Sequence, residues 1–177
     1  MTKVNRGKDF EEQIRIAFEN IPDVSIDRIP DQMGGFAGGS NVCDFIVYDC
    51  PSIYYLECKS FYGNTMSIFS NPKTNKLGVK HGFYGNITDT QWKGLLEKSK
   101  IKGAVAGYMI WAIEWDKTFF ISAEDMKAWR DAGHKSINMN EYMDIPHYAI
   151  KGQKRRVLFD YDMIPFLKGE NYEQDKH

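Results

Sequence analysis

The chain has 177 residues, of which 42% are hydrophobic and 14% aromatic, so one folded domain with a hydrophobic core is expected rather than a disordered chain. Lys and Arg total 23 and Asp and Glu total 24, for a formal net charge of -1, which excludes a globally basic protein but not a local basic surface that binds nucleic acid. The cysteines (Cys43, Cys50 and Cys58) are odd in number and lack CxxC spacing, so neither a disulfide framework nor a zinc ribbon is expected.

No segment of the sequence has the length and apolar character of a membrane span. The longest uncharged, mostly apolar run, residues 103–113, has 11 residues, whereas a helix that crosses a bilayer needs ~20. The charged residues after Met1 lead into no apolar stretch, so no secretory signal is expected. We therefore expect a cytoplasmic protein that makes no membrane contact.

The first half of the chain predicts one helix followed by strands. Apolar residues at helical spacing predict a helix over residues 8–20 (Phe10, Ile14, Ala17 and Phe18). Further along, the pattern predicts a short strand at 24–29, a glycine-rich loop at 31–40, and a hairpin with strands at 44–48 and 53–59.

The second half predicts a mixed α/β fold. Residues 60–87 have little periodicity and form a long loop of the kind that is often functional. The pattern then predicts a helix capped by Thr88 and Gln91, strands at 104–115 and 117–121, and a helix that starts after Ser122 and ends near Gly133. We expect one domain over residues 1–168 and a flexible C-terminal tail over residues 169–177, with a mixed central sheet flanked by helices.

The residues with the clearest chemistry are Asp44 and the triplet Glu57-Cys58-Lys59. Residues two apart on a strand project from the same face, so Glu57 and Lys59 point the same way and Asp44 reaches them across the hairpin. Leu56 and Cys58 then face the core. Two converging carboxylates repel each other unless a cation joins them, and hard oxygen ligands suit Mg²⁺, with Mn²⁺ expected to substitute. Because a lysine beside a metal-bound water orients that water and stabilises charge on a phosphate, the pattern predicts a site for phosphodiester hydrolysis.

A second acidic-x-lysine triplet, Asp125-Met126-Lys127, shows that this spacing alone is a weak signal. It lies in the first turn of a capped helix, where acidic residues are common and residues two apart do not share a face. For Glu57 and Lys59, the alternative is a solvated ion pair at the end of a strand.

Two further residues are candidates for the same site. Glu11 lies at the edge of the buried stripe of the first helix, about 100° from Phe10, and is a better third acid than Glu12, which faces solvent. The alternative for Glu11 is an i, i+4 ion pair with Arg15. Gln91 opens the next helix, where it either serves the capping box alone or also helps to hold the ligands or a water.

In combination, these motifs resemble the RecU family of Holliday junction resolvases, in the PD-(D/E)xK nuclease superfamily. Asn5-Arg6-Gly7-x-x-x-Glu11 resembles the N-terminal motif of that family, and Asp44 with Glu57-Cys58-Lys59 resembles its metal-binding core. Gln91 falls where the family has an active-site glutamine, and Gly133-x-Lys135-Ser136-Ile137 resembles a further family stretch. The matches are collinear and extend over about residues 5 to 165.

The resemblance implies a restriction-endonuclease-like core in which Asp44 and Glu57 bind Mg²⁺. It implies that Lys59 assists the attacking water and that Gln91 supports the site, with Glu11 as a further catalytic candidate. It also implies a homodimer that nicks a four-way DNA junction symmetrically, in DNA recombination and repair. Since one site per chain makes one cut, two symmetric cuts fit a two-fold dimer on a two-fold substrate.

The sequence departs from the family in two places. Only residues 21–43 fill the interval where the family has a long stalk, and Val42 and Cys43 stand where the family has threonines. Both departures bear on junction specificity more than on nuclease chemistry. Two alternatives therefore stay open: an endonuclease acting on other branched, single-stranded or duplex DNA, and a non-catalytic DNA-binding module.

Basic side chains mark the expected DNA surface, because phosphate contacts dominate affinity for DNA. The densest cluster lies within residues 151–156. The candidate DNA-binding residues are Arg6, Lys80, Lys151, Lys154, Arg155 and Arg156. For the cluster at 151–156, the alternative is an ordinary solvated run of charge.

Overall fold

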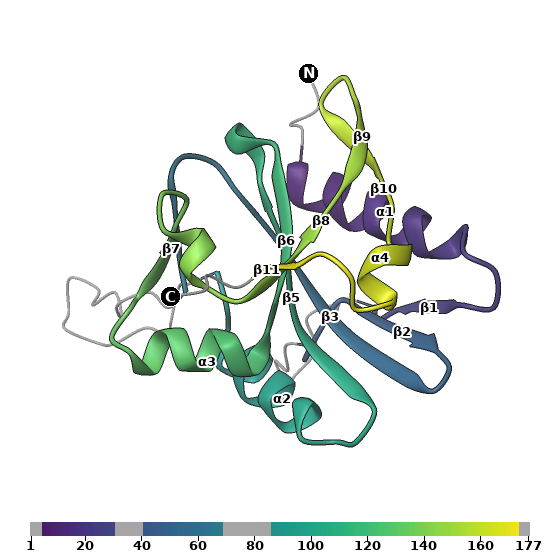
Figure 1. Ribbon diagram of the computed structural model, residues 1–177, viewed down its shortest axis with the longest axis horizontal. Helices are drawn as coiled ribbons and strands as arrows, with labels where there is room; N and C mark the ends of the chain where they lie inside the picture. Colours follow the sequence, from purple (N-terminus) through teal and green to yellow (C-terminus); the bar gives the residue numbers. More distant parts are fainter. Residues whose placement is uncertain (1–4, 31–40, 69–85, 174–177) are drawn as a thin grey trace.

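One mixed β-sheet organises the chain, and helices cover both of its faces (Figure 1). The computed structural model describes residues 5–30, 41–68 and 86–173. The sheet has seven strands in the order β1-β2-β3-β5-β6-β8-β11. The predicted class, a mixed α/β fold with a central sheet flanked by helices, is confirmed.

The elements follow one another in this order: α1 (Arg6–Glu19), β1 (Ser25–Arg28), β2 (Phe45–Asp49), β3 (Ser52–Phe61), β4 (Thr65–Ser67), α2 (Asp89–Ser99), β5 (Ala104–Ala112), the 3₁₀ helix η1 (Ile113–Trp115), β6 (Lys117–Ser122), α3 (Ala123–Asp131), β7 (Ser136–Asn138), the 3₁₀ helix η2 (Tyr142–Asp144), β8 (His147–Ile150), β9 (Gly152–Arg155), β10 (Leu158–Tyr161), α4 (Ile164–Leu167) and β11 (Tyr172–Glu173). Two small sheets, β4 with β7 and β9 with β10, lie outside the seven-stranded sheet.

Strand β3 connects the two halves of the sheet. It pairs with β2 as an antiparallel hairpin, with Phe45 opposite Leu56. It pairs with β5 in parallel, with Glu57 opposite Tyr108, and α2 lies in the connection, as a parallel pair requires a crossover. Strand β5 is buried along most of its length, which explains its continuous apolar sequence.

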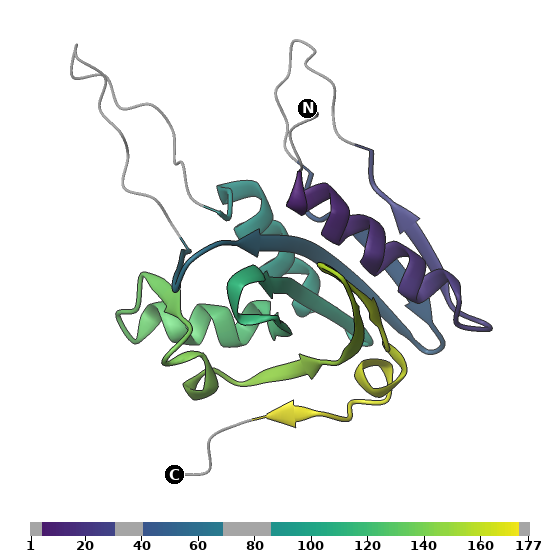
Figure 2. The ribbon, with the colours of Figure 1, turned by 90° about the horizontal axis from the view of Figure 1, so that it is seen from above.

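The two faces of β3 belong to two different cores. Leu56 and Cys58 lie in the core that contains the buried face of α1. Phe61 projects from the same face of β3 as Glu57 and Lys59, since it lies two residues after Lys59. It belongs to the core that contains the buried residues of α2 and α3. The predicted division of β3 is therefore confirmed. Figure 2 shows α1 and α2 on either side of the curved sheet, and both helices contact β3.

Helix α1 begins two residues earlier than the periodicity predicts. The side chain of Asn5 accepts a hydrogen bond from the backbone N–H of Lys8 at 3.4 Å and caps the helix. Phe10, Ile14 and Phe18 are fully buried, as their spacing predicts.

Three segments differ from the sequence-based expectations. The strand predicted for residues 104–115 ends at Ala112, because Ile113–Trp115 form a 3₁₀ turn that closes at Asp116 with φ of 49°. The predicted loop 60–87 includes the last two residues of β3 and all of β4, while its residues 69–85 lie outside the described chain. Tyr172–Glu173, within the segment assigned to a flexible tail, pair with β8.

Candidate active site

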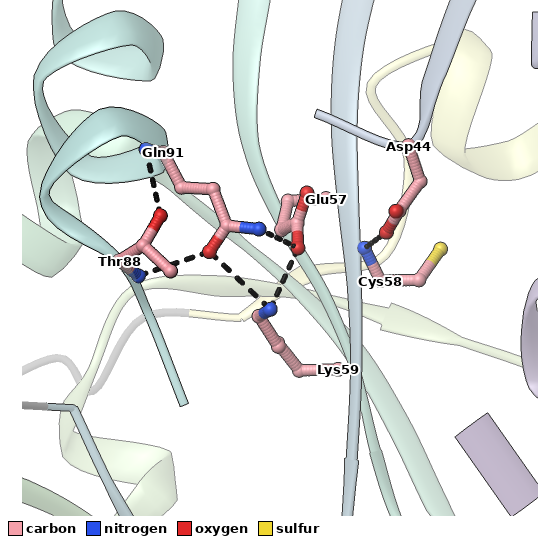
Figure 3. A network of polar contacts seen from close by, with 6 residues as sticks. All are labelled: Asp44, Glu57, Cys58, Lys59, Thr88 and Gln91. Atoms are coloured by element: carbon pink, nitrogen blue, oxygen red, sulfur yellow. Dashed lines mark hydrogen bonds and ion pairs between the residues drawn. The ribbon is translucent and has the colours of Figure 1, made fainter. Parts of the chain in front are cut away.

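Glu57 and Lys59 form an ion pair on the face of β3 that is turned toward α2 (Figure 3). Lys59 Nζ lies 2.6 Å from Glu57 Oε1. The Glu57 residue is only 2% exposed, and the Lys59 side chain is 18% exposed. The alternative of a solvated ion pair at a strand end is therefore wrong, because the carboxylate is buried in the sheet rather than exposed to solvent.

Gln91, in the first turn of α2, contacts both Glu57 and Lys59. Its Nε2 donates to Glu57 Oε1, and its Oε1 accepts from Lys59 Nζ at 3.4 Å. The same Oε1 accepts the backbone N–H of Thr88 at 3.0 Å, and the Thr88 hydroxyl accepts the backbone N–H of Gln91 at 3.2 Å. The predicted capping box is confirmed, and the same side chain also contacts Glu57 and Lys59, so the capping contacts do not prevent Gln91 from serving the candidate site.

Asp44 stands directly before β2, at the turn from Cys43 into the sheet. Its Oδ2 accepts the backbone N–H of Cys58 at 2.7 Å, and its own N–H donates to the carbonyl of Leu56 at 3.0 Å. These bonds fix the carboxylate against β3, next to Glu57. In Figure 3, Glu57 lies between Gln91 and Asp44.

Burial raises the pKa of Glu57 to about 8. The Lys59 charge acts in the opposite direction, while the carboxylates of Asp44 and Glu11 raise the pKa of Glu57 further. The charges of Asp44, Lys59 and Glu11 thus all act on the pKa of Glu57. A nearby cation would relieve this repulsion.

The donor set fits a hard divalent cation. Within the described chain, Glu57 Oε2 is buried and has no hydrogen-bond partner, and an orphaned carboxylate oxygen is costly to bury. Asp44 supplies a second carboxylate beside it. No group of three or more His, Cys, Asp or Glu residues with metal-binding spacing occurs in the ranges 5–30, 41–68 and 86–173. Two carboxylates with water suit Mg²⁺, which keeps several of its waters in proteins.

Glu11 lies at the rim of the site rather than among its direct contacts. Its Oε2 accepts from Arg28 at 2.9 Å, which ties α1 to β1. The alternative of an i, i+4 pair with Arg15 is wrong, because Arg15 pairs with Glu12 at 2.7 Å and, through another nitrogen, with Glu19.

Of the expected DNA-binding residues that the structure describes, one lies on α1 and four lie on or next to the β9–β10 hairpin, and α1 contacts β10. Arg6 pairs with Asp9 at 3.1 Å in the first turn of α1, and Lys80 lies outside the described residues. The other four lie on or next to the β9–β10 hairpin: Lys151, Lys154, Arg155 and Arg156. Two of these are paired with acids in the free protein, Lys154 with Asp116 and Arg155 with Asp160.

Two contributors were missed at the sequence level. The sequence predicts Thr88 only as a helix cap, whereas its hydrogen bonds also hold the Gln91 side chain, and the capping-box pattern is the one signal in the sequence that points to this contact. The N–H of Cys58 anchors Asp44, and no sequence pattern reports a backbone donor.

Comparisons with known proteins assign no family to the chain. No protein-family model matches the chain, and no curated protein matches it. Among solved structures, the chain is similar to Hjc, a Holliday junction resolvase from the archaeal hyperthermophile Archaeoglobus fulgidus, with a TM-score of 0.48 and 12% sequence identity, over 77% of this chain and 91% of that chain. At this TM-score and identity, no residue role carries over from Hjc.

The described helices are also short. In residues 5–30, 41–68 and 86–173, no helix is long and apolar enough to cross a membrane.

Proposed function

We propose that this protein is a Mg²⁺-dependent endodeoxyribonuclease that cuts branched DNA, with the four-way junction as its preferred substrate. The observation that carries the proposal is the contact network in which Gln91, Glu57 and Lys59 meet beside Asp44. The family resemblance of the same residues supports the junction as substrate. Mn²⁺ is expected to substitute for Mg²⁺.

Each residue has a distinct role in this proposal. Asp44 and Glu57 hold the cation, which when bound lowers the pKa of a coordinated water and neutralises charge on the scissile phosphate. Lys59 Nζ donates to Glu57 Oε1 and Gln91 Oε1. Since an ammonium group has three donors, one N–H remains to orient the attacking water or to contact a phosphate oxygen.

Gln91 and Glu11 act around this centre. Gln91 holds Glu57 and Lys59 in register from α2. Glu11 adds negative charge beside Glu57 and ties α1 to β1 through Arg28. Water attacks the phosphorus and gives up a proton, the bond to one deoxyribose oxygen breaks, and that oxygen takes up a proton, so the strand is left with a hydroxyl and a phosphate at the nick.

Symmetric resolution of a junction requires two such sites. One chain carries one site, and a two-fold dimer matches the two-fold symmetry of a four-way junction. We therefore propose a homodimer as the active form.

The test compares a synthetic four-way junction with linear duplexes that have the same arm sequences, each in Mg²⁺ and in EDTA. The expected result is cleavage of the junction in Mg²⁺, on strands related by symmetry, with no product in EDTA. Equal cutting of junction and duplex would favour the alternative endonuclease, with other branched, single-stranded or duplex DNA as substrate. Tight binding without cutting of any DNA would favour the non-catalytic DNA-binding module.

A further inference from the structure

We propose that Thr88 is a positioning residue of this active site, because it holds the Gln91 amide in the orientation that joins Glu57 to Lys59. The proposal rests on the nuclease function proposed above, and it assigns to a helix cap a role in organising the site. Thr88 acts through Gln91, whose backbone and side chain it holds by hydrogen bonds.

The partners of Gln91 determine which end of its amide faces which group. Its Oε1 meets the N–H of Thr88 at 3.0 Å and Lys59 Nζ at 3.4 Å, and both of these groups are donors. A flipped amide would place an NH₂ group against two donors and leave the carboxylate of Glu57 facing a carbonyl oxygen. Only the observed orientation satisfies all three partners.

Thr88 fixes Gln91 at two points. Its hydroxyl accepts the backbone N–H of Gln91 at 3.2 Å, and its backbone N–H donates to the side-chain oxygen. The side chain is thereby curled back toward the start of α2 instead of extending into solvent, as a glutamine in a first helical turn otherwise can. Losing the hydroxyl frees the backbone at Gln91 and loosens the turn that aims its amide.

Helix α3 offers a matched cap that is unconnected to the site. The Ser122 hydroxyl accepts the backbone N–H of Asp125 at 3.0 Å, as Thr88 does for Gln91. The Asp125 side chain, however, stays within its own cap, because its Oδ2 accepts a hydrogen bond from the Ser122 hydroxyl at 2.6 Å. Removing either hydroxyl therefore removes the hydrogen bond that caps a helix, but in the described chain only the Thr88 cap holds a side chain that contacts Glu57 and Lys59.

The experiment compares Thr88→Val, Thr88→Ser and Ser122→Ala with the wild-type chain. Thr88→Val and Ser122→Ala should lower the thermal midpoint by a similar few degrees, on the order of 4 °C or less for a chain of this length. Thr88→Val should reduce the single-turnover cleavage rate at saturating DNA by about tenfold, the change that a barrier increase of about 1.4 kcal/mol produces. Its DNA affinity should stay unchanged, and Thr88→Ser and Ser122→Ala should cleave within about twofold of wild type.

A second measurement does not depend on cleavage. The side-chain amide of Gln91, identified in an NMR spectrum by its loss in Gln91→Leu, should exchange slowly with solvent in the wild type and in Thr88→Ser. It should exchange faster, with averaged shifts, in Thr88→Val.

The two measurements separate the possible failures. A wild-type chain that cuts no DNA overturns the nuclease function, while the NMR comparison still decides the role of Thr88. Equal amide protection and equal cleavage rates in Thr88→Val and Ser122→Ala would overturn the positioning role.

Discussion

Glu57 lies in an unfavourable electrostatic environment for a charged carboxylate. It is buried, its Oε2 has no partner in the described chain, and Asp44 and Glu11 both disfavour its charged form. Lys59 offsets only part of this cost. A carboxylate placed in this way lowers the stability of the fold when it is charged, and the cation proposed above would offset that cost.

Glu57→Gln should therefore stabilise the metal-free protein at alkaline pH. The pKa of Glu57 is raised from 4.5 to about 8, so its contribution to the free energy of unfolding is complete below pH 4.5 and is lost as the pH rises through 8. In EDTA at pH 9, the variant should be more stable by about 1–3 kcal/mol, since one pKa unit corresponds to about 1.4 kcal/mol and the unpaired Lys59 offsets part of the gain.

Chemical denaturation at pH 5 and pH 9 provides the measurement. The difference between the variant and the wild type should shrink at pH 5. Addition of Mg²⁺ at pH 9 should stabilise the wild type and leave the variant unchanged. A difference of equal size at both pH values would contradict the assignment of Glu57 as the titrating group.

Lys59→Ala should abolish cleavage, and Lys127→Ala is its matched control. Both lysines follow an acidic-x-lysine pattern, but Lys127 lies on the exposed face of α3 and pairs with Asp131. We expect a loss of at least about 100-fold in cleavage rate for Lys59→Ala, the usual range for a group that assists proton transfer or charge stabilisation.

Junction binding by Lys59→Ala, measured by fluorescence anisotropy, should remain within about threefold of wild type. Lys127→Ala should keep both activities. Loss of cleavage in both variants to the same extent would remove the distinction on which the Lys59 assignment is based.

At the scale of elements, the position of α2 depends on a close approach between a helix and the segment that leads into Asp44. A Cβ atom at Gly94 would lie 2.6 Å from Cγ1 and 2.7 Å from Cγ2 of Val42. Gly94 is one helical turn after Gln91, and Val42 is two residues before Asp44. The absence of a side chain at Gly94 therefore sets the distance between two parts of the site.

Gly94→Ala should change its effect on stability when Val42 is also shortened. In the wild-type background, overpacking costs about 1–3 kcal/mol and exceeds the gain of about 1 kcal/mol in helix propensity, so the variant should unfold at lower denaturant concentration and cleave more slowly. In a Val42→Ala background, the two Cγ contacts are absent and only the contact with Cβ of residue 42, at 3.1 Å, remains, so Gly94→Ala should cost clearly less stability than in the wild-type background. A double-mutant cycle measures the coupling directly, and additive effects would exclude the packing explanation.

Local patterns in the sequence predicted the central elements well. Alternation around Glu57 and Lys59 placed both on one face of β3 and opposite to Leu56, and the capping box placed Gln91 in the first turn of α2. These features depend on residues within about one turn or one strand of each other, where periodicity is informative.

Contacts between distant segments were beyond such patterns. The pairing of β4 with β7 joins segments about 70 residues apart, with Met66 opposite Ile137, and nothing local marks either segment as a strand. The turn at Asp116 interrupts an apolar run that reads as continuous strand. The partner of Glu11, Arg28, is likewise set by how α1 packs on β1.

At the scale of the whole molecule, the net charge of -1 is the sum of segregated parts. Acidic residues meet at the site, and basic residues gather at the β9–β10 hairpin, whose Phe159 and Tyr161 belong to the α1 side of the sheet. The turn of this hairpin carries Arg156 with φ of 58°, an exposed position at which the guanidinium has no acidic partner in the described chain. The hairpin therefore has a positively charged surface although the net charge of the whole chain is only -1.

DNA affinity should consequently fall steeply with salt concentration, and Arg156→Ala should make that fall shallower. Each phosphate neutralised by a basic side chain contributes about -0.9 to the slope of log K against log salt on duplex arms. Lys154 and Arg155 begin from ion pairs with Asp116 and Asp160, and such exposed pairs are weak enough for phosphate to replace the acids.

The reference slope comes from the binding of a junction to Lys59→Ala, which is followed by fluorescence anisotropy between about 50 and 200 mM salt in EDTA. Adding Arg156→Ala should reduce the magnitude of the slope by about 0.9, and adding Lys127→Ala should leave it unchanged. If both added substitutions leave the slope unchanged, Arg156 does not contact phosphate, and its assignment to the DNA surface is wrong.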